Sequence, residues 1–162
     1  FDEVLDNVRE HRARYVTVTG GEPLAQPACW PLLSKLCDED YAVSLETSGA
    51  ISIANVDHRV SIVMDLKTPS SGEVGRNDYG NIELLKADDQ VKFVIADRQD
   101  FDWALFKLEQ FGLNERVSEV LFSPVFENLA PAELAAWVLD KHLPVRVQVQ
   151  LHKILWGDKP GV

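Results

Sequence analysis

Four short polar clusters in the 162-residue chain carry residue types that can bind a charged or heterocyclic ligand. Each cluster lies at the end of a β-rich run of the chain. Because the loops after parallel strands meet at one edge of a sheet, and α/β folds bind ligands there, we expect the four clusters to share one site. They are Thr19-Gly20-Gly21-Glu22-Pro23, Glu46-Thr47-Ser48-Gly49, Asp65 with Lys67, and the segment from Gln148 to His152.

The first cluster has the composition of a receptor for an ammonium group. Gly20 and Gly21 can adopt positive φ and leave their carbonyls open to a ligand. Glu22 adds a carboxylate, whose oxygens only accept hydrogen bonds. The alternative is a plain strand-to-helix turn with a solvated Glu22. The sequence has neither the Walker spacing nor G-x-G-x-x-G, so this turn is not predicted to bind phosphate.

The other clusters each leave two interpretations open. Glu46 either accepts hydrogen bonds from a heterocycle or a ribose, or pairs with a nearby lysine. Lys67 either holds a carboxylate or hydroxyl of a ligand, or forms a salt bridge with Asp65 or Glu46. His152, which follows Gln150, is a candidate ligand contact, with a structural role as the alternative.

The two cysteines do not have the spacing of a metal or cluster site. Cys29 and Cys37 are eight residues apart on a predicted helix, which places them about 80° apart around its axis. Without a C-x2-C or C-x3-C pair, a zinc site or an iron–sulfur cluster built from this chain alone is not expected. Both cysteines are predicted to pack in the core. The sequence also lacks G-x-S-x-G and H-E-x-x-H.

The composition is that of a single acidic globular domain over residues 1–162. Hydrophobic residues make up 46% and charged residues 26%, and the formal net charge is -10. This charge repels phosphodiester backbones and anionic lipid, so we expect no nucleic-acid or membrane partner. No apolar run approaches the roughly 20 residues of a membrane span, and we expect a cytoplasmic protein. The chain starts at Phe1, inside a run with helical spacing, which predicts that an N-terminal part is missing.

Six β-rich runs alternate with helical patterns along the chain. The predicted strands cover residues 15–18, 42–45, 61–66, 91–95, 120–122 and 145–151, with a long loop at 67–81 and a short helix at 82–87. Such alternation predicts parallel βαβ units in an α/β sheet, open or curved into a barrel. The last run alternates apolar and polar residues, which favours a curved sheet with a polar interior, a partial TIM-like (β/α) barrel of about six strands. The alternative for that run is an edge strand with a solvent face.

Taken together, four segments resemble the 7-carboxy-7-deazaguanine synthase family of radical S-adenosylmethionine enzymes. They are the segments from Thr19 to Pro23, Leu45 to Gly49, Asp65 to Glu73 and Gln148 to Lys153. The resemblance implies an incomplete TIM-like barrel, of which this chain would be the C-terminal two-thirds. It also implies conversion of 6-carboxy-5,6,7,8-tetrahydropterin to 7-carboxy-7-deazaguanine with loss of ammonia, in queuosine and 7-deazapurine biosynthesis.

The same resemblance implies S-adenosylmethionine, a [4Fe-4S] cluster and Mg2+ as cofactors. The cluster loop, of the C-x3-C-x2-C type, and the Mg2+ site would lie upstream of Gly20 and outside this chain. The chain alone would then be inactive, with no metal ligand and no catalytic residue of its own. The implied partners are the pterin substrate, an electron donor such as flavodoxin, and a second copy in a homodimer.

The binding roles of the family fall on residues of the four clusters. By resemblance, Gly20, Gly21 and Glu22 would hold the methionyl amine, and Glu46, Ser48 and Lys67 would complete the S-adenosylmethionine site or face the pterin. Thr19, Gln150 and His152 would contact the substrate.

Two functions of other kinds remain open on the sequence. A barrel hydrolase would use Glu22 and Glu46 as a carboxylate pair roughly 5–9 Å apart. A non-catalytic binding or assembly module would keep the polar edge of the sheet without the cluster.

Overall fold

A computed structural model describes residues 2–157 and 159, and for His152 it describes the backbone alone. Its centre is a six-stranded, all-parallel sheet in which each strand pairs with the one before it in the chain. The strands are β1 (Tyr15–Val18), β2 (Ala42–Thr47), β3 (Ser61–Asp65), β4 (Gln90–Ile95), β5 (Glu119–Pro124) and β6 (Arg146–Val147).

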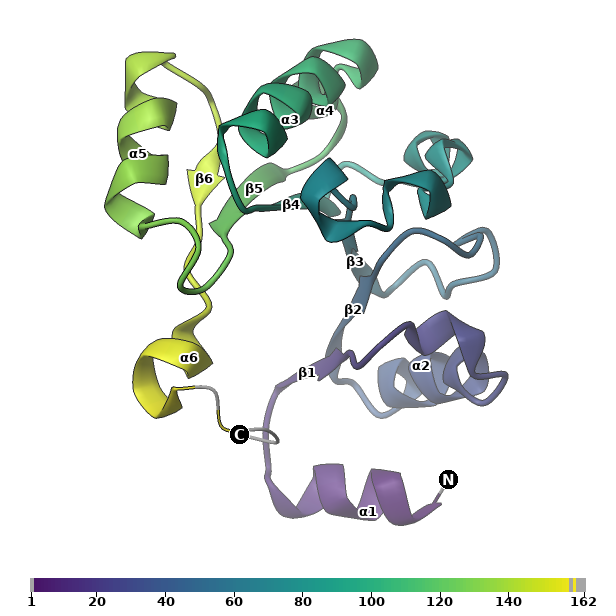
Figure 1. The fold of residues 1–162 in the computed structure, drawn as a ribbon. Coiled ribbons are helices and arrows are strands. Elements are labelled where there is room, and N and C mark those ends of the chain that lie inside the picture. The colour runs from purple at the N-terminus through teal and green to yellow at the C-terminus, as the bar shows by residue number, and fades with distance from the viewer. Residues whose placement is uncertain (1, 158, 160–162) are drawn as a thin grey trace.

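The strand order explains the curvature of the sheet. The strand order never reverses and βαβ crossovers are right-handed, so the connecting helices pack on the same face of the sheet. The sheet curves away from that face, and its other face becomes concave. Figure 1 shows a curved sheet with α2, α3 and α5 outside it and an opening between β1 and β6. The expected α/β fold, an unclosed barrel of six parallel strands, is confirmed.

Helices and short 3-10 turns connect the strands. The α-helices are α1 (Asp2–Glu10), α2 (Cys29–Asp38), α3 (Arg98–Phe111), α4 (Leu113–Arg116), α5 (Pro131–Asp140) and α6 (Leu151–Trp156). The 3-10 turns are η1 (Pro23–Ala25), η2 (Pro69–Ser71), η3 (Val74–Arg76) and η4 (Tyr79–Leu84). Local sequence sets several of their ends: the Asp97 side chain caps α3, Gly112 ends it in the left-handed region, and Pro131 begins α5.

The two faces of the sheet differ in polarity. Leu45, Met64, Phe93 and Phe122 point to the helix-covered face and are fully buried in the core. The residues that alternate with them along each strand point to the concave face. This face is rich in polar groups that bind one another across strands. These include Thr17 with Ser44 at 2.9 Å, Glu46 with Lys92 at 3.3 Å, and Glu119 with Arg146 at 2.6 Å. The concave face therefore has the polarity of a ligand-holding interior.

The last predicted strand is shorter than expected. Only Arg146–Val147 forms a strand, which pairs with β5 alone, and the Gln148 N–H extends the pairing by one bond to the Phe122 carbonyl at 2.9 Å. The chain then turns, and α6 begins at Leu151. The prediction of a strand to residue 151 is wrong. Leu151, Ile154 and Leu155 also have helical spacing, and the run after Pro144 is too short for its pattern to decide between strand and helix. β6 lies at the edge of the sheet, and the sheet is curved (Figure 1), as the alternation of this run predicts.

The long loop after β3 is more ordered than its composition indicates. It contains η2, η3 and the first half of η4, and the helix predicted at 82–87 is instead the second half of η4, which ends at Leu84. The Asp78 side chain accepts a hydrogen bond from the Gly80 N–H at 3.0 Å, which starts η4 three residues earlier than the apolar pattern does.

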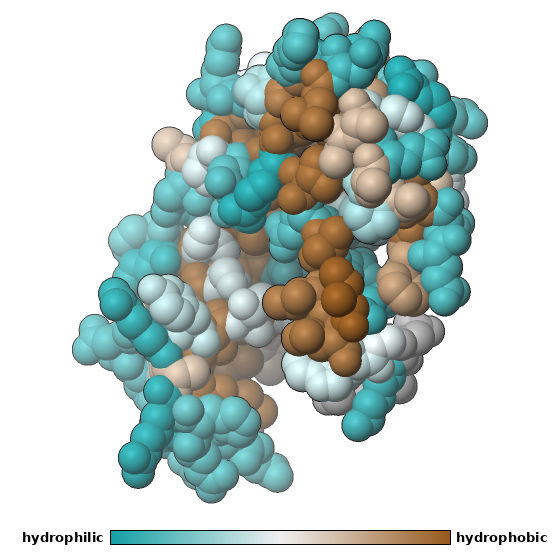
Figure 2. All heavy atoms as spheres, turned by 90° about the vertical axis from the view of Figure 1, so that its left-hand side faces the viewer, coloured by the Kyte–Doolittle hydropathy of each residue, from teal (hydrophilic) through white to brown (hydrophobic). Residues whose placement is uncertain are grey.

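Helix α6 exposes large apolar side chains. Figure 2, which faces this side of the molecule, shows apolar residues gathered on it. Those on α6 are Leu151, Ile154, Leu155 and Trp156, each more than half exposed. Among the described residues, no helix has both the length and the apolar character needed to cross a membrane.

Candidate functional site

Glu22 joins the turn after β1 to the loop after β2. Its two carboxylate oxygens lie 2.9 and 3.0 Å from the Thr47 hydroxyl, and they accept the N–H of Leu24 at 3.2 Å and of Ser48 at 2.8 Å. The Ser48 hydroxyl also donates to Glu22. Thr47 is buried, so these bonds form away from bulk water. The protein itself holds the Glu22 carboxylate, which a solvated residue of a plain turn would not require.

The turn that precedes Glu22 leaves backbone groups open. Gly20 and Gly21 have φ of 110° and 59°, a region that glycine enters without strain. An added Cβ at either position would meet no atom within 4 Å, so the backbone conformation, not crowding, is what favours glycine there. Thr19, just before them, is exposed. The turn can therefore present carbonyls to a ligand, as expected.

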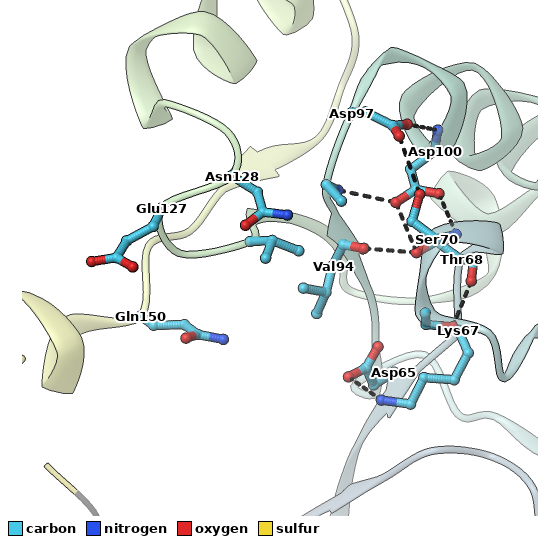
Figure 3. Close-up of a pocket in the computed structure, with 13 residues that line it drawn as sticks. Asp65, Lys67, Thr68, Ser70, Val94, Asp97, Asp100, Glu127, Asn128 and Gln150 are labelled. Atoms are coloured by element: carbon cyan, nitrogen blue, oxygen red, sulfur yellow. Dashed lines mark hydrogen bonds and ion pairs between the residues drawn. The ribbon is translucent and has the colours of Figure 1, made fainter. Parts of the chain in front are cut away.

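Lys67 lies between two cavities at the carboxyl ends of the strands. The smaller, about 260 Å³, is also lined by Glu22, Ser48 and Ile51. The larger, about 870 Å³, extends from Asp65 and Lys67 past Ala96 to Asn128 and Gln150. Figure 3 shows Asp65 at the end of β3, Lys67 just after it, Asn128 in the loop after β5 and Gln150 just before α6, arranged around the opening.

The predicted site residues are brought together in part. Glu22, Ser48 and Lys67 share the smaller cavity, and Lys67 and Gln150 share the larger one. Glu46 lines neither of these two cavities, nor do Thr19, Gly20 and Gly21. The side chain of His152 lies outside what the structure describes, and its backbone is in α6.

Both of the ion pairs considered for Lys67 and for Glu46 are present in the structure. Lys67 Nζ lies 2.9 Å from Asp65 Oδ2, and Lys92 Nζ lies 3.3 Å from Glu46 Oε2. Glu22 and Glu46 therefore have separate partners, and Glu46 does not line the cavity that Glu22 lines. This arrangement gives no support to a hydrolase that uses them as a pair.

Several polar residues of the larger cavity were not singled out from the sequence. They are Thr68, Asp97, Asp100, Glu127 and Asn128. Asp97 follows β4, and Glu127 and Asn128 follow β5, so the strand-end rule that identified the other clusters also applies to them. A signal for Asp97, Glu127 and Asn128 was therefore present. Thr68 lies in the segment from Asp65 to Glu73 that carries the resemblance, whereas Asp100 lies inside α3 and has no such signal.

Two side chains hold the start of the long loop. Asn77 makes two hydrogen bonds of 2.9 Å to the backbone of Lys67, one to its N–H and one to its carbonyl. Asp100 is fully buried and accepts the Thr68 hydroxyl at 3.1 Å and the Ser70 N–H at 3.0 Å. These bonds fix the segment that forms one wall of both cavities.

The cysteines of this chain do not fit an iron–sulfur cluster. Cys29 and Cys37 are both free and buried on α2, which packs on the outer face of the sheet. Over residues 2–157 and 159, no group of three or more His, Cys, Asp or Glu is placed to hold a metal ion. Both cysteines belong to the core, as predicted.

Both thiols are expected to react slowly in the folded chain. Burial raises the pKa of Cys29 and of Cys37, and the nearby Glu22 carboxylate raises that of Cys29 further. Since the thiolate is the reactive form, labelling by 5,5′-dithiobis(2-nitrobenzoate) at pH 8 should be at least roughly 100-fold slower than in 6 M guanidinium chloride. Equal rates in the two solutions would show that the thiols are accessible.

A glycine in the loop after β2 is required by both conformation and space. Gly49 has φ of 68°, and an added Cβ would lie 2.8 Å from Met64 Sδ. Gly49→Ala should therefore lower the free energy of unfolding by about 2 kcal/mol, measured by urea denaturation. Gly112→Ala is the matched control, because Gly112 has a similar φ of 56° and no atom within 4 Å of the added Cβ. A loss of about 1 kcal/mol is expected for the control, from the left-handed conformation alone, and equal losses would exclude the Met64 contact as a cause.

Comparisons with known proteins give a consistent set of sequence relatives. No protein-family model matches the chain. The chain is 41% identical to the 7-carboxy-7-deazaguanine synthase of Chlorobaculum tepidum, and the match covers 100% of this chain and 75% of that protein. It is 40% identical to the Koribacter versatilis protein of the same name, over 87% of this chain and 68% of that one. For the Clostridium acetobutylicum protein of that name, the identity is 33%, over 99% and 75%.

Solved structures give the same fold at low sequence identity. Streptococcus suis SuiB bound to S-adenosylmethionine matches with a TM-score of 0.59 and 12% identity, over 84% of this chain and 38% of that chain. SuiB bound to its precursor peptide SuiA matches with a TM-score of 0.65 and 12% identity, over 91% and 40%. The chain thus spans about two fifths of SuiB.

The unclosed six-stranded parallel barrel places the chain in the fold class of SuiB, whose structure was solved with S-adenosylmethionine bound. The sequence relatives identify the chain more specifically than the fold does, because they are 33–41% identical to it over most of its length. The chain belongs to the 7-carboxy-7-deazaguanine synthase family of enzymes.

Proposed function

We propose that this chain forms the S-adenosylmethionine- and pterin-binding wall of an enzyme that converts 6-carboxy-5,6,7,8-tetrahydropterin to 7-carboxy-7-deazaguanine with loss of ammonia. The observation that carries the proposal is the convergence of Glu22, Ser48 and Lys67 on one cavity in a chain of this family. A binding module would account for the polar edge, but the family relationship favours an enzyme.

In this proposal the turn after β1 receives the methionyl part of S-adenosylmethionine. Gly20 and Gly21 offer backbone carbonyls as acceptors, and the fixed negative charge of Glu22 favours the ammonium group. Thr47 and Ser48 hold that carboxylate in place, so the receptor is already formed before the ligand arrives. Bound S-adenosylmethionine would supply the radical that begins the reaction.

The remaining predicted residues are assigned to the rest of the ligands. Lys67 borders both cavities, so its ammonium can serve the carboxylate of S-adenosylmethionine or of the pterin. Glu46 faces the concave side and offers acceptors to the N–H groups of the pterin. Gln150 lines the larger cavity, whose volume of about 870 Å³ is ample for a heterocyclic ligand. Thr19 and His152 are assigned to the substrate by resemblance.

We propose that the 162-residue chain alone neither assembles the cluster nor turns over the pterin. Three cysteine ligands are implied by the family, whereas this chain has two cysteines, both buried away from the cavities. No residue described here is assigned to the cluster or to Mg2+. A homodimer, a reductant such as flavodoxin and a cytoplasmic location are part of the same proposal.

The experiment uses the enzyme expressed from its complete gene and reconstituted anaerobically with iron and sulfide. With S-adenosylmethionine, Mg2+, dithionite and 6-carboxy-5,6,7,8-tetrahydropterin, we expect release of 7-carboxy-7-deazaguanine and ammonia. The 162-residue chain treated in the same way should give no product. A reconstituted full-length enzyme that gives no product, or gives it without S-adenosylmethionine, would overturn the proposal.

A further inference from the structure

On the concave face, Lys92 has two carboxylates as neighbours, those of Glu46 and Asp65. Lys92 Nζ lies 3.3 Å from Glu46 Oε2. In the parallel register, however, Lys92 of β4 is the direct partner of Asp65 of β3, whereas Glu46 of β2 is the partner of Val63. Register partners on one face of a sheet are neighbours. Lys92 therefore reaches across β3 to Glu46, past the carboxylate that stands beside it.

This arrangement leaves the nearer carboxylate half satisfied. Asp65 Oδ2 accepts the Lys67 ammonium at 2.9 Å, but Asp65 Oδ1 is buried and has no hydrogen-bond partner among the described residues. Leaving a buried acceptor of a charged group unpaired is unfavourable. A movement that brought Lys92 Nζ within hydrogen-bond distance of Asp65 Oδ1 would remove that unfavourable contribution.

The carboxylate that Lys92 does contact is the more open of the two. The Glu46 side chain is 42% exposed, against 16% for Asp65 and 17% for Lys92. Glu46 can therefore exchange its lysine for another donor more readily than the less exposed Asp65 can. The lysine stem is long and flexible enough to move between two neighbouring carboxylates.

We infer that Lys92 positions Glu46 while the site is empty and transfers to Asp65 Oδ1 when a ligand donates hydrogen bonds to Glu46. The inference rests on the proposed function in taking that ligand to be a pterin, whose ring N–H groups match a carboxylate. The new Lys92–Asp65 pair offsets the loss of the Lys92–Glu46 pair. Lys92 is thus a positioning residue, and Asp65 is the partner that lets it release Glu46.

The first test is a double-mutant cycle on pterin binding. Calorimetry would measure the affinity of the full-length enzyme for 6-carboxy-5,6,7,8-tetrahydropterin without S-adenosylmethionine, so that no turnover occurs. Asp65→Asn should weaken binding about tenfold when Lys92 is present, because Lys92 then stays on Glu46. In a Lys92→Met background the same change should cost no more than about twofold. Equal losses in both backgrounds would mean that Asp65 acts through Lys67 or the fold, which would overturn the inference.

A matched control uses another ion pair of the concave face. Arg146 pairs with Glu119 at 2.6 Å, and neither contacts Asp65. In an Arg146→Met background, Asp65→Asn should still weaken binding about tenfold. Loss of the effect in this background would show that any missing cation on the face has the same result, which would also overturn the role of Lys92.

The second test needs no ligand and separates this inference from the proposed function. In a crystal structure of Glu46→Gln in the full-length enzyme, Lys92 Nζ should lie about 3 Å from Asp65 Oδ1, because the charge has been removed from residue 46. A Lys92 that still points to residue 46 would overturn the inference. A wild-type enzyme that binds no pterin would overturn the proposed function alone, and the crystal structure would still decide the role of Lys92.

Discussion

A Glu22→Gln variant is expected to lose about 3 kcal/mol of the free energy of unfolding, although glutamine has the shape of glutamate. One Glu22 oxygen accepts the Leu24 N–H and the other accepts the Ser48 N–H. An amide offers one oxygen and one NH2 group, so in either orientation the NH2 faces a backbone N–H. Urea-induced unfolding of the wild-type and variant chains, followed by circular dichroism, measures the loss.

The same variant is expected to weaken S-adenosylmethionine binding by the full-length enzyme at least tenfold, since it removes the negative charge proposed to face the ammonium group. Glu73→Gln is the matched control. Glu73 lines the same cavity but is exposed, and its charge pairs with Arg76 at 2.8 Å. The free energy of unfolding of the Glu73→Gln control should stay within about 0.5 kcal/mol of that of the wild type. Equal stabilities of the two variants would contradict the anchoring role of Glu22.

The parts of the fold that were predictable are those in which local pattern and tertiary structure agree. β2, β3 and β4 were expected from short β-rich runs, and their outward residues Leu45, Met64 and Phe93 are fully buried. The last strand was not predictable in the same way. Its alternation continues to residue 151, but Leu151 also begins a helical apolar pattern, and only pairing with β5 decides where the strand ends.

The site was predictable in position but not in partnership. Glu22 and Ser48 were expected at the same edge of the sheet, and they share a cavity. Thr47 and Ser48 satisfy the Glu22 carboxylate only because the loops after β1 and β2 lie side by side in the folded chain. Local sequence does not specify how two loops 25 residues apart are placed relative to each other. The same reasoning applies to Asp100, whose partners Thr68 and Ser70 lie 32 and 30 residues earlier in the chain.

An Asp100→Asn variant is expected to lose about 4 kcal/mol of the free energy of unfolding, more than Glu22→Gln. Asp100 is fully buried, and its oxygens accept the Ala96 N–H at 3.0 Å, the Ser70 N–H at 3.0 Å and the Thr68 hydroxyl at 3.1 Å. The two backbone donors bind different oxygens, so the amide of asparagine again faces one N–H with its own NH2 group. Urea-induced unfolding measures the loss.

Asp97→Asn, three residues earlier, separates a requirement for negative charge in this region from a requirement for two acceptors. Asp97 is exposed, and its side chain accepts one backbone N–H, that of Asp100 at 2.9 Å, while its other oxygen contacts the Ser70 hydroxyl at 3.2 Å. Asparagine can keep both contacts, because its oxygen faces the N–H and its NH2 group can donate to the hydroxyl. The control should therefore change stability by no more than about 0.5 kcal/mol. A comparable loss in both variants would place the effect in the acidic charge of the helix start, whereas a loss confined to Asp100→Asn assigns it to the buried carboxylate that holds the cavity wall.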